Sequence, residues 1–200
     1  MSQGRYIALL RGINVGGKNI IKMADLRASF EAMGFTEVET YIQSGNVVFS
    51  SKSLDKPKLV RTIEKTLSDA FGYRSRVVLV SSKELEAVVV QAPPGFGKQP
   101  TRYRYDVVFV KEPLRTEEAL QQLTAKPGVD AVHAGEHALY FRRLIAKNAF
   151  SQLTRVTQLP LYQSITIRNW NTTTELAAMV SGEASSEING GRRRRQTSHP

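Results

Sequence analysis

Residues 6–49 carry the clearest signal of fold and read YIALLRGINVGGKNIIKMADLRASFEAMGFTEVETYIQSGNVVF. The apolar run 6–10 is typical of a buried strand, and the glycine-rich loop 11–19 follows it. Over residues 23–33, apolar side chains recur every three or four positions, which predicts an amphipathic helix. Residues 38–49 predict two strands joined by a tight turn. This order of strand, helix, strand and strand begins a split β-α-β unit.

The rest of the chain completes this unit and then repeats its pattern. A helix over residues 59–71 and a strand over 76–80 finish a β-α-β-β-α-β order. A short helix at 83–90 and a Pro/Gly-rich linker come next. The second round is predicted to contain strand 105–110, a helix from residue 116, strands 129–132 and 138–144, helix 146–158, strand 164–168 and a closing helix 172–180.

We therefore expect an α+β protein of two tandem ferredoxin-like (βαββαβ) units packed together, whose antiparallel sheets carry helices on one face. The last segment is expected to be a disordered basic tail, because it is rich in Gly and Ser and holds no aromatic residue. The expected division of the chain is a first unit at 1–82, a connecting helix and linker at 83–102, a second unit with the closing helix at 103–180, and the tail at 181–200.

The chain is basic, with 28 Lys and Arg against 18 Asp and Glu, a net charge of +10. The tail arginines at 192–195 explain little of this excess, because two glutamates oppose them. No acidic residue occurs between Glu136 and Glu175. A basic balance indicates nucleic acid or another phosphate-bearing partner, and a solvated basic face is the alternative. The basic residues of the acid-free stretch are Arg142, Arg143, Lys147, Arg155 and Arg168.

Composition excludes several classes of protein. The chain has no cysteine, which rules out a disulfide framework, a thiolate metal site and a cysteine nucleophile. His133 and His137 are four residues apart on a hairpin rather than a helix, so we expect no metal, and no cofactor is indicated. The apolar runs are too short for a signal peptide or a membrane span, so we expect a cytoplasmic protein with no membrane partner. The sequence does not indicate the oligomeric state.

The glycine-rich loop partly matches a phosphate-binding P-loop. Gly12 to Lys18 satisfies the G-x-x-x-x-G-K half of that motif. Asn19, however, stands where a Ser or Thr would hold Mg²⁺, and the predicted helix begins too late to meet a phosphate. Either the glycine N–H groups bind an anion together with basic side chains, or the loop is structural with glycines at positive φ. The candidate ligand-binding residues are Arg11, Gly12, Asn14, Gly16, Gly17, Lys18 and Asn19.

The turn at Ser44-Gly45-Asn46 is more typical of a hairpin than of a nucleophile, because no histidine is placed as a base for Ser44. In a unit of this topology, the first strand–helix loop and this hairpin leave the sheet at the same edge. We therefore expect residues 11–19 and 44–46 to be neighbours. Gln43, Ser44 and Asn46 join the candidate site on this ground.

A second basic cluster is expected at one edge of the second unit. The end of strand 138–144, the start of the helix after it and the end of strand 164–168 should share this edge. Trp170 either stacks on a ligand ring or anchors the closing helix, which Asn171 or Thr172 would cap. The candidate residues are Arg142, Arg143, Lys147, Arg168, Asn169 and Trp170.

Aromatic residues on neighbouring strands of the second unit allow two interpretations. They resemble the base-stacking platform of an RNA-recognition motif, although the signature sequence of that motif is absent. Core packing is the stronger explanation. The residues concerned are Tyr103, Tyr105, Phe109, Tyr140 and Phe141.

Three ordered stretches resemble the DUF1697 family of uncharacterised bacterial proteins. They are RGINVGGKN at 11–19, YIQSGNVVF at 41–49 and TIRNWNT at 166–172, and the similarity extends over about residues 3–180. The resemblance implies a duplication of ferredoxin-like units. It implies no activity, substrate or catalytic residue.

The leading hypothesis is a protein that binds a phosphate-bearing ligand, either a nucleotide, a phosphorylated metabolite or RNA. The Gly-rich loop and the arginine cluster would supply the contacts. One alternative is an enzyme acting on a small phosphorylated or nucleotide substrate through Asn14, Gln43, Ser44 and Asn46. Another alternative is a non-catalytic interaction module that uses exposed sheet edges.

Overall fold

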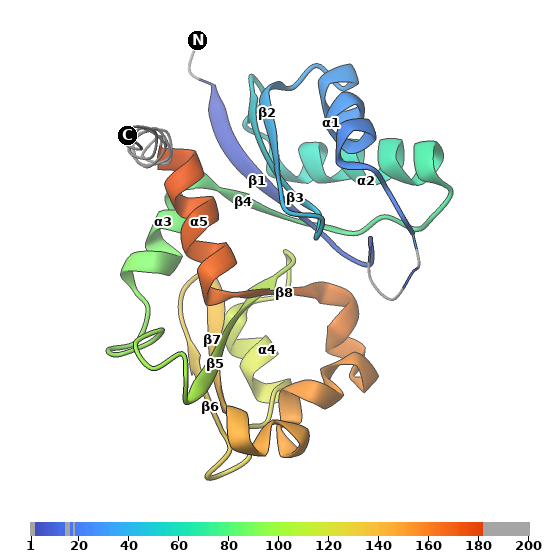
Figure 1. Ribbon diagram of the computed structural model, residues 1–200. Coiled ribbons are helices and arrows are strands. Elements are labelled where there is room, and N and C mark those ends of the chain that lie inside the picture. The colour runs from blue at the N-terminus through green and yellow to red at the C-terminus, as the bar shows by residue number, and fades with distance from the viewer. Residues whose placement is uncertain (1–2, 15–16, 18, 182–200) are drawn as a thin grey trace, which may run out of the picture.

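The computed structural model describes residues 3–14, 17 and 19–181 (Figure 1). The strands are β1 (Gly4–Leu10), β2 (Thr36–Tyr41), β3 (Asn46–Ser51), β4 (Val77–Ser81), β5 (Tyr103–Val110), β6 (Asp130–Ala134), β7 (Ala138–Leu144) and β8 (Ile165–Asn169). The α-helices are α1 (Met23–Ala32), α2 (Lys56–Phe71), α3 (Ser82–Val90), α4 (Thr116–Gln122) and α5 (Trp170–Ser181). Three 3₁₀ segments lie between β7 and β8, namely η1 (Ile145–Phe150), η2 (Gln152–Gln158) and η3 (Pro160–Ser164).

The strands form two four-stranded sheets in which every pair is antiparallel. The first sheet has the order β2-β3-β1-β4 and the second has the order β6-β7-β5-β8. The two orders are equivalent strand for strand, since the first strand of each half lies between the third and the fourth. The α+β class with antiparallel sheets is therefore confirmed.

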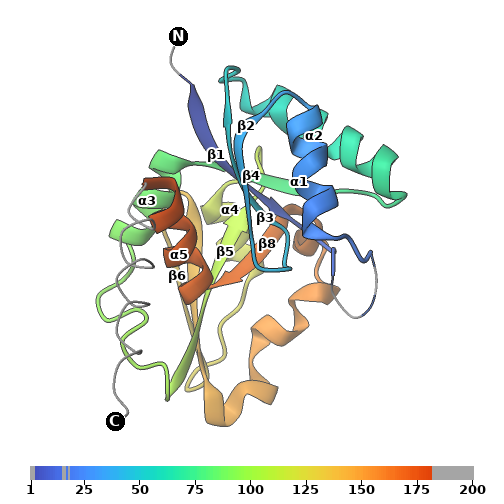
Figure 2. The ribbon, with the colours of Figure 1, turned by 45° about the horizontal axis from the view of Figure 1, so that its top comes forward.

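Each sheet is covered on both faces, so the expectation of helices on one face is wrong. α1 and α2 pack on the outer face of the first sheet, and α4 with the 3₁₀ segments packs on the outer face of the second (Figures 1 and 2). The inner faces share one core with α3 and α5. The physical reason is that the central strands are apolar on both sides, as in sheets buried between two layers. The shared core includes Ile7, Leu9, Val48, Val78, Leu85, Val107, Phe109, Tyr140 and Leu176.

The helix predicted over residues 146–158 is not continuous, because this segment forms the two 3₁₀ segments η1 and η2. Lys147 leaves helical geometry with φ −121° and ψ 20°. Ser151 then starts a new turn, since its hydroxyl accepts from the Leu153 amide and its carbonyl accepts from the Thr154 hydroxyl. Such side-chain hydrogen bonds compete with a continuous helix.

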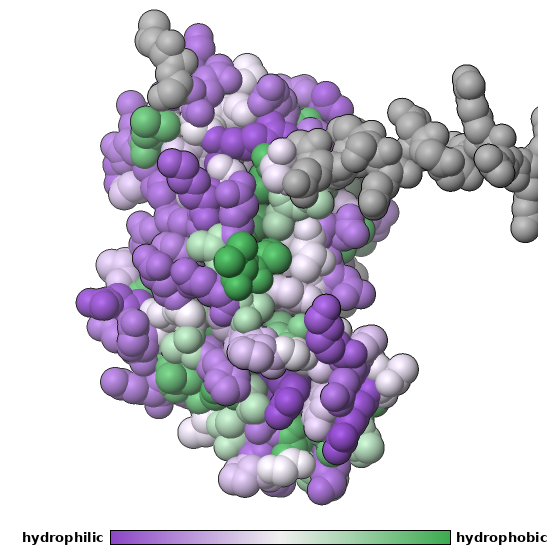
Figure 3. All heavy atoms as spheres, turned by 90° about the vertical axis from the view of Figure 1, so that its left-hand side faces the viewer, coloured by the Kyte–Doolittle hydropathy of each residue, from purple (hydrophilic) through white to green (hydrophobic). Residues whose placement is uncertain are grey.

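The face that carries α3 and α5 is mainly hydrophilic, with a compact hydrophobic patch near its middle (Figure 3). Val90, the last residue of α3, is 83% exposed. No helix among residues 3–14 and 19–181 is both long and apolar enough to cross a membrane.

Candidate functional site

Three segments that are distant in sequence meet at the guanidinium of Arg168. This residue lies near the end of β8 and is only 8% exposed. Its Nε donates to Asn46 Oδ1 at 2.5 Å, and its Nη2 donates to the carbonyl of Leu10 at 2.9 Å. Figure 2 shows β8 beside the β2–β3 turn, after which Asn46 begins β3. Arg168 therefore joins the second sheet to the first.

The remaining donors of Arg168 are also satisfied by neutral acceptors. Nη1 donates to Thr166 Oγ1 and to the Ile167 carbonyl, each at 2.8 Å, and Nη2 also donates to the Ser44 carbonyl at 3.2 Å. No carboxylate of the described residues pairs with this guanidinium. Burial lowers the pKa of Arg168 to about 10, so the group is still charged at neutral pH. The junction thus holds a desolvated positive charge that no acid within residues 3–14 and 19–181 neutralises.

The loop after β1 and the β2–β3 turn are neighbours, as predicted. Asn14 Nδ2 donates to the carbonyls of Gln43 and Ile21, both at 3.0 Å, and its Oδ1 accepts from the Ile21 amide. Asn19 Nδ2 donates to the Gly12 carbonyl at 2.7 Å. Both asparagines have positive φ, 53° at Asn14 and 49° at Asn19. Their amides therefore hold the loop together instead of facing a ligand.

Two other candidate residues of these segments, Asn46 and Gly17, differ in their exposure to solvent. Asn46 is fully buried, and its Nδ2 donates to the Tyr41 carbonyl and the Ser44 hydroxyl. Gly17 is exposed, with φ +73°. The candidates Gly16 and Lys18 lie outside the described residues.

A groove of about 360 Å³ opens at this junction. Arg11 lines it, with its guanidinium 4.3 Å from the centre of the Tyr162 ring. Arg11 and Arg168 are the charged residues in the lining, and no Asp or Glu is among the described lining residues. The lining consists of Leu10, Arg11, Gly12, Ile13, Ile42, Ser44, Tyr162, Ile165, Thr166, Ile167, Arg168, Asn169 and Thr172.

Tyr162 and Ile42 belong to the groove, and sequence reasoning missed both. Ile42 is half exposed and has φ +48°, which is rare for a β-branched side chain and strained. Its place in the YIQSGN stretch gave no signal of this geometry. Tyr162 lies in η3, where no periodic pattern points to the first sheet.

The second predicted cluster shares one end of its sheet but does not converge on one ligand. Tyr105 pairs with Arg142 and Val107 pairs with Arg168, which puts both arginines toward the same end, as predicted. The side chains of the cluster separate, because Arg142 lies over the Tyr103 ring and Arg143 pairs with Asp106 at 2.9 Å, while Arg168 enters the junction. No residue lines both the groove and the cavity next to Arg142.

Of the other members of this cluster, Asn169 and Trp170 contact neighbouring residues of the protein and Lys147 is exposed. Asn169 caps α5, because its Oδ1 accepts from the Thr172 amide at 2.7 Å, and so the cap is neither Asn171 nor Thr172. Trp170 packs edge-on against Phe96 at 5.1 Å, which matches the anchoring interpretation. Lys147 is exposed on η1.

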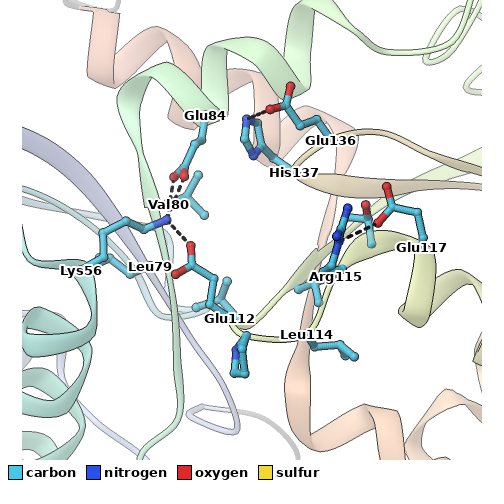
Figure 4. Close-up of a pocket in the computed structure, with 14 residues that line it drawn as sticks. Lys56, Leu79, Val80, Glu84, Glu112, Leu114, Arg115, Glu117, Glu136 and His137 are labelled. Atoms are coloured by element: carbon cyan, nitrogen blue, oxygen red, sulfur yellow. Dashed lines mark hydrogen bonds and ion pairs between the residues drawn. The ribbon is translucent and has the colours of Figure 1, made fainter.

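A second cavity, of about 260 Å³, lies beside β4 and contains many charged groups that pair with one another (Figure 4). Lys56 at the start of α2 donates to Glu84 of α3 at 2.8 Å and to Glu112 after β5 at 2.7 Å. Figure 4 also shows Arg115 directed to Glu117. These ion pairs hold α2, α3 and the second half of the chain together, so this cavity offers few free charges to a ligand.

The Lys56–Glu84 pair gives the protein a predictable dependence on pH. Burial opposes ionisation of Glu84, but hydrogen bonds from Lys56 and the Ser81 amide outweigh it and lower the pKa below its usual 4.5. A carboxylate with a lowered pKa stabilises the fold above its ordinary pKa and loses this contribution as pH falls. Burial likewise opposes the charge of Lys56, but the carboxylates of Glu84 and Glu112 outweigh burial and raise the pKa of Lys56. The stability that charged Lys56 contributes is therefore lost only at strongly alkaline pH.

Replacing Lys56 by Met is expected to lower the free energy of unfolding by roughly 1–2 kcal/mol near neutral pH, after allowance for solvent screening. The difference from wild type should shrink as pH falls from about 6 to about 3, because Glu84 is then protonated. Urea unfolding of both proteins at several pH values measures this difference in the free energy of unfolding. Lys65→Met is the control, since Lys65 pairs with Asp69 on the exposed side of α2 and should cost less than about 0.5 kcal/mol. A Lys56→Met difference that stays constant with pH contradicts the prediction.

The comparisons with known proteins agree with this architecture. The chain is an α+β protein of two four-stranded antiparallel sheets. It belongs to the family described as "Protein of unknown function (DUF1697)", whose model matches residues 3–140. It is also similar to the solved structure of the conserved bacterial protein SP0830 from Streptococcus pneumoniae, with 27% identity and a TM-score of 0.79. That match covers 90% of this chain and 99% of the other. None of the curated proteins matches this chain.

Proposed function

We propose that the groove at the three-segment junction binds the phosphate group of a small ligand, either a nucleotide or a phosphorylated metabolite. The observation that carries the proposal is the charge of its described lining, which includes Arg11 and Arg168 but no acidic residue. A concave site with one sign of charge and buried walls concentrates the field and attracts an ion of the opposite sign.

Arg168 would act on the ligand through its charge rather than by direct contact. Its N–H groups already donate to protein acceptors, and it is almost fully buried. A charge in a low-dielectric setting is weakly screened and acts over a longer distance than one in water. An anion in the groove would therefore gain electrostatic energy from Arg168 as well as from any direct partner.

Arg11 would be the direct phosphate ligand. Its backbone is fixed by a hydrogen bond from its amide to the Arg76 carbonyl at 3.0 Å, and its guanidinium lies over Tyr162. The planar guanidinium can offer two parallel N–H groups to a phosphate. The Ser44 hydroxyl, which also lines the groove, provides a neutral partner beside it.

A binding role fits the polar residues better than a catalytic one. Asn14 and Asn46 use their amides to hold the two loops, and Ser44 Oγ accepts from Asn46 Nδ2. No histidine is among the described lining residues that could activate Ser44 as a nucleophile.

We further propose that the protein is a duplication of ferredoxin-like units, at residues 1–82 and 103–180, joined through 83–102. The equivalent strand orders support this interpretation. The second unit would have replaced its second helix by η1, η2 and η3.

The groove is tested by isothermal titration of the full chain with inorganic phosphate, pyrophosphate, AMP and a sugar phosphate. We expect at least one phosphate-bearing probe to bind, and Arg11→Ala to weaken it by about tenfold or more, the usual value of a charged hydrogen bond. Arg74→Ala is the matched control, since Arg74 is exposed and lies outside the groove. Failure of every probe, or equal loss in both variants, overturns the proposal.

A further inference from the structure

Two aromatic rings, one at the start of β5 and one at the end of η1, each lie close to basic side chains. Tyr103 stands at the start of β5. The centre of its ring is 4.6 Å from the Arg142 guanidinium and 5.2 Å from the Arg102 guanidinium. Phe150, at the end of η1, is 63% exposed and has Lys126 Nζ at 5.0 Å from its centre. We call these residues, Arg102, Tyr103, Lys126, Arg142 and Phe150, the Tyr103–Phe150 surface.

The basic side chains of this surface have no acidic partner in the described part of the chain. Arg102, Lys126 and Arg142 are exposed, and none of them forms an ion pair there. By contrast Arg143, the next residue along β7, pairs with Asp106. Two guanidinium groups close to one tyrosine ring repel each other, and a nearby anion offsets this repulsion.

Hydrogen bonds connect the segments that carry the two cation–aromatic groups. Residues 128–130 line a cavity of about 270 Å³ together with Arg102, Tyr103 and Arg142. Lys126, at the start of the same segment, covers Phe150, and its amide donates to Asp130 Oδ2 at 3.2 Å. The amide of Ile145, where η1 begins, donates to the Arg102 carbonyl at 3.0 Å.

We propose that the Tyr103–Phe150 surface binds single-stranded nucleic acid. Such surfaces combine cations that follow the backbone phosphates with aromatic rings and guanidinium planes on which unpaired bases stack. Phe150 provides an exposed ring, and Arg102, Lys126 and Arg142 provide phosphate partners that form no ion pair with an acid of the described residues. A duplex would not use the exposed ring, because its bases are already stacked. This surface shares no lining residue with the groove, so the inference is independent of the function proposed there.

The core aromatic residues on the same sheet take no part in it. Tyr105, Phe109, Tyr140 and Phe141 are all buried, so the core-packing interpretation holds for these four. Only Tyr103, at the strand end, is partly exposed.

The test is fluorescence anisotropy of labelled oligouridine of about 12 nucleotides, within the range of single-strand sites, with the full chain. Phe150→Ala is expected to weaken binding by about fivefold or more, which is the loss of one stacked base. Arg102→Ala/Arg142→Ala should lower the slope of log affinity against log salt by about 1.4, for two lost phosphate contacts. Lys52→Ala/Lys58→Ala removes two exposed charges from the first half of the chain and should change little.

Inorganic polyphosphate separates stacking from charge, because it carries phosphates without bases. Phe150→Ala should bind polyphosphate as tightly as wild type, while the double arginine variant binds it less tightly. The proposal is overturned if Phe150→Ala and the double arginine variant both bind oligouridine like wild type. It is equally overturned if Phe150→Ala weakens polyphosphate binding as much as oligouridine binding. Circular dichroism of each variant checks that the fold is kept, and Lys126→Ala provides a second charge variant on the same surface.

Discussion

Arg168→Ala is expected to lower the free energy of unfolding by about 3–5 kcal/mol, the largest effect of any single substitution considered. The substitution removes the guanidinium donors to Asn46 Oδ1 and to the Leu10 carbonyl, and it opens a cavity between the sheets. Each buried acceptor left without a donor costs about 1–3 kcal/mol. Urea unfolding followed by Trp170 fluorescence measures the change.

Two further variants separate the sources of this loss. Arg168→Lys keeps the charge but not the planar group that reaches acceptors on both sheets, so it should restore only a small part of the stability. Arg142→Ala removes an exposed arginine from β7 of the same sheet and should change stability by less than about 0.5 kcal/mol. A loss for Arg168→Ala no larger than that of Arg142→Ala would show that the junction contributes no stability.

Much of the fold follows from local sequence patterns. The helix at 23–32 and the hairpin at 36–51 have periodic apolar positions and clear turn residues, and their order restricts the topology to a few choices. The same reasoning predicted that the loop after β1 lies against the β2–β3 turn. These contacts lie within one half of the chain, where strand pairing alone sets the geometry.

The site was predicted less completely because its residues come from both halves of the chain. Arg168 was expected to bind a ligand, yet the acceptors that join it to the first sheet lie about 120–160 positions earlier in the sequence, a contact that no local pattern encodes. For the same reason Tyr162 was missed, although it lies over Arg11. Sequence patterns indicate which face of a strand is buried, but not which other surface covers it.

The three stretches that resemble one family prove to be one structural unit. Leu10 precedes the first, Asn46 belongs to the second and Arg168 to the third, and hydrogen bonds join all three. Their side-chain amides and the guanidinium are mostly used to hold this junction. The groups that remain for the proposed phosphate ligand are then chiefly those of Arg11.

Gly45→Ala is expected to lower the free energy of unfolding by about 2–5 kcal/mol. Gly45 has φ +74°, and a Cβ added there would lie 2.8 Å from Leu10 Cβ and 2.9 Å from Ile13 Cδ1. The left-handed backbone costs about 1–2 kcal/mol for alanine, and overpacking adds about 1–3 kcal/mol. Thermal and urea unfolding of the variant measure the sum.

Gly12→Ala is the matched control, because Gly12 has nearly the same φ, +70°, but nothing within 4 Å of an added Cβ. It should lose only the backbone part, about 1–2 kcal/mol, and keep the junction closed. The difference between the two variants measures how tightly the β2–β3 turn packs on the end of β1. If both glycines prove equally costly to replace, the turn is free to move away from Leu10, and the groove is not a preformed site.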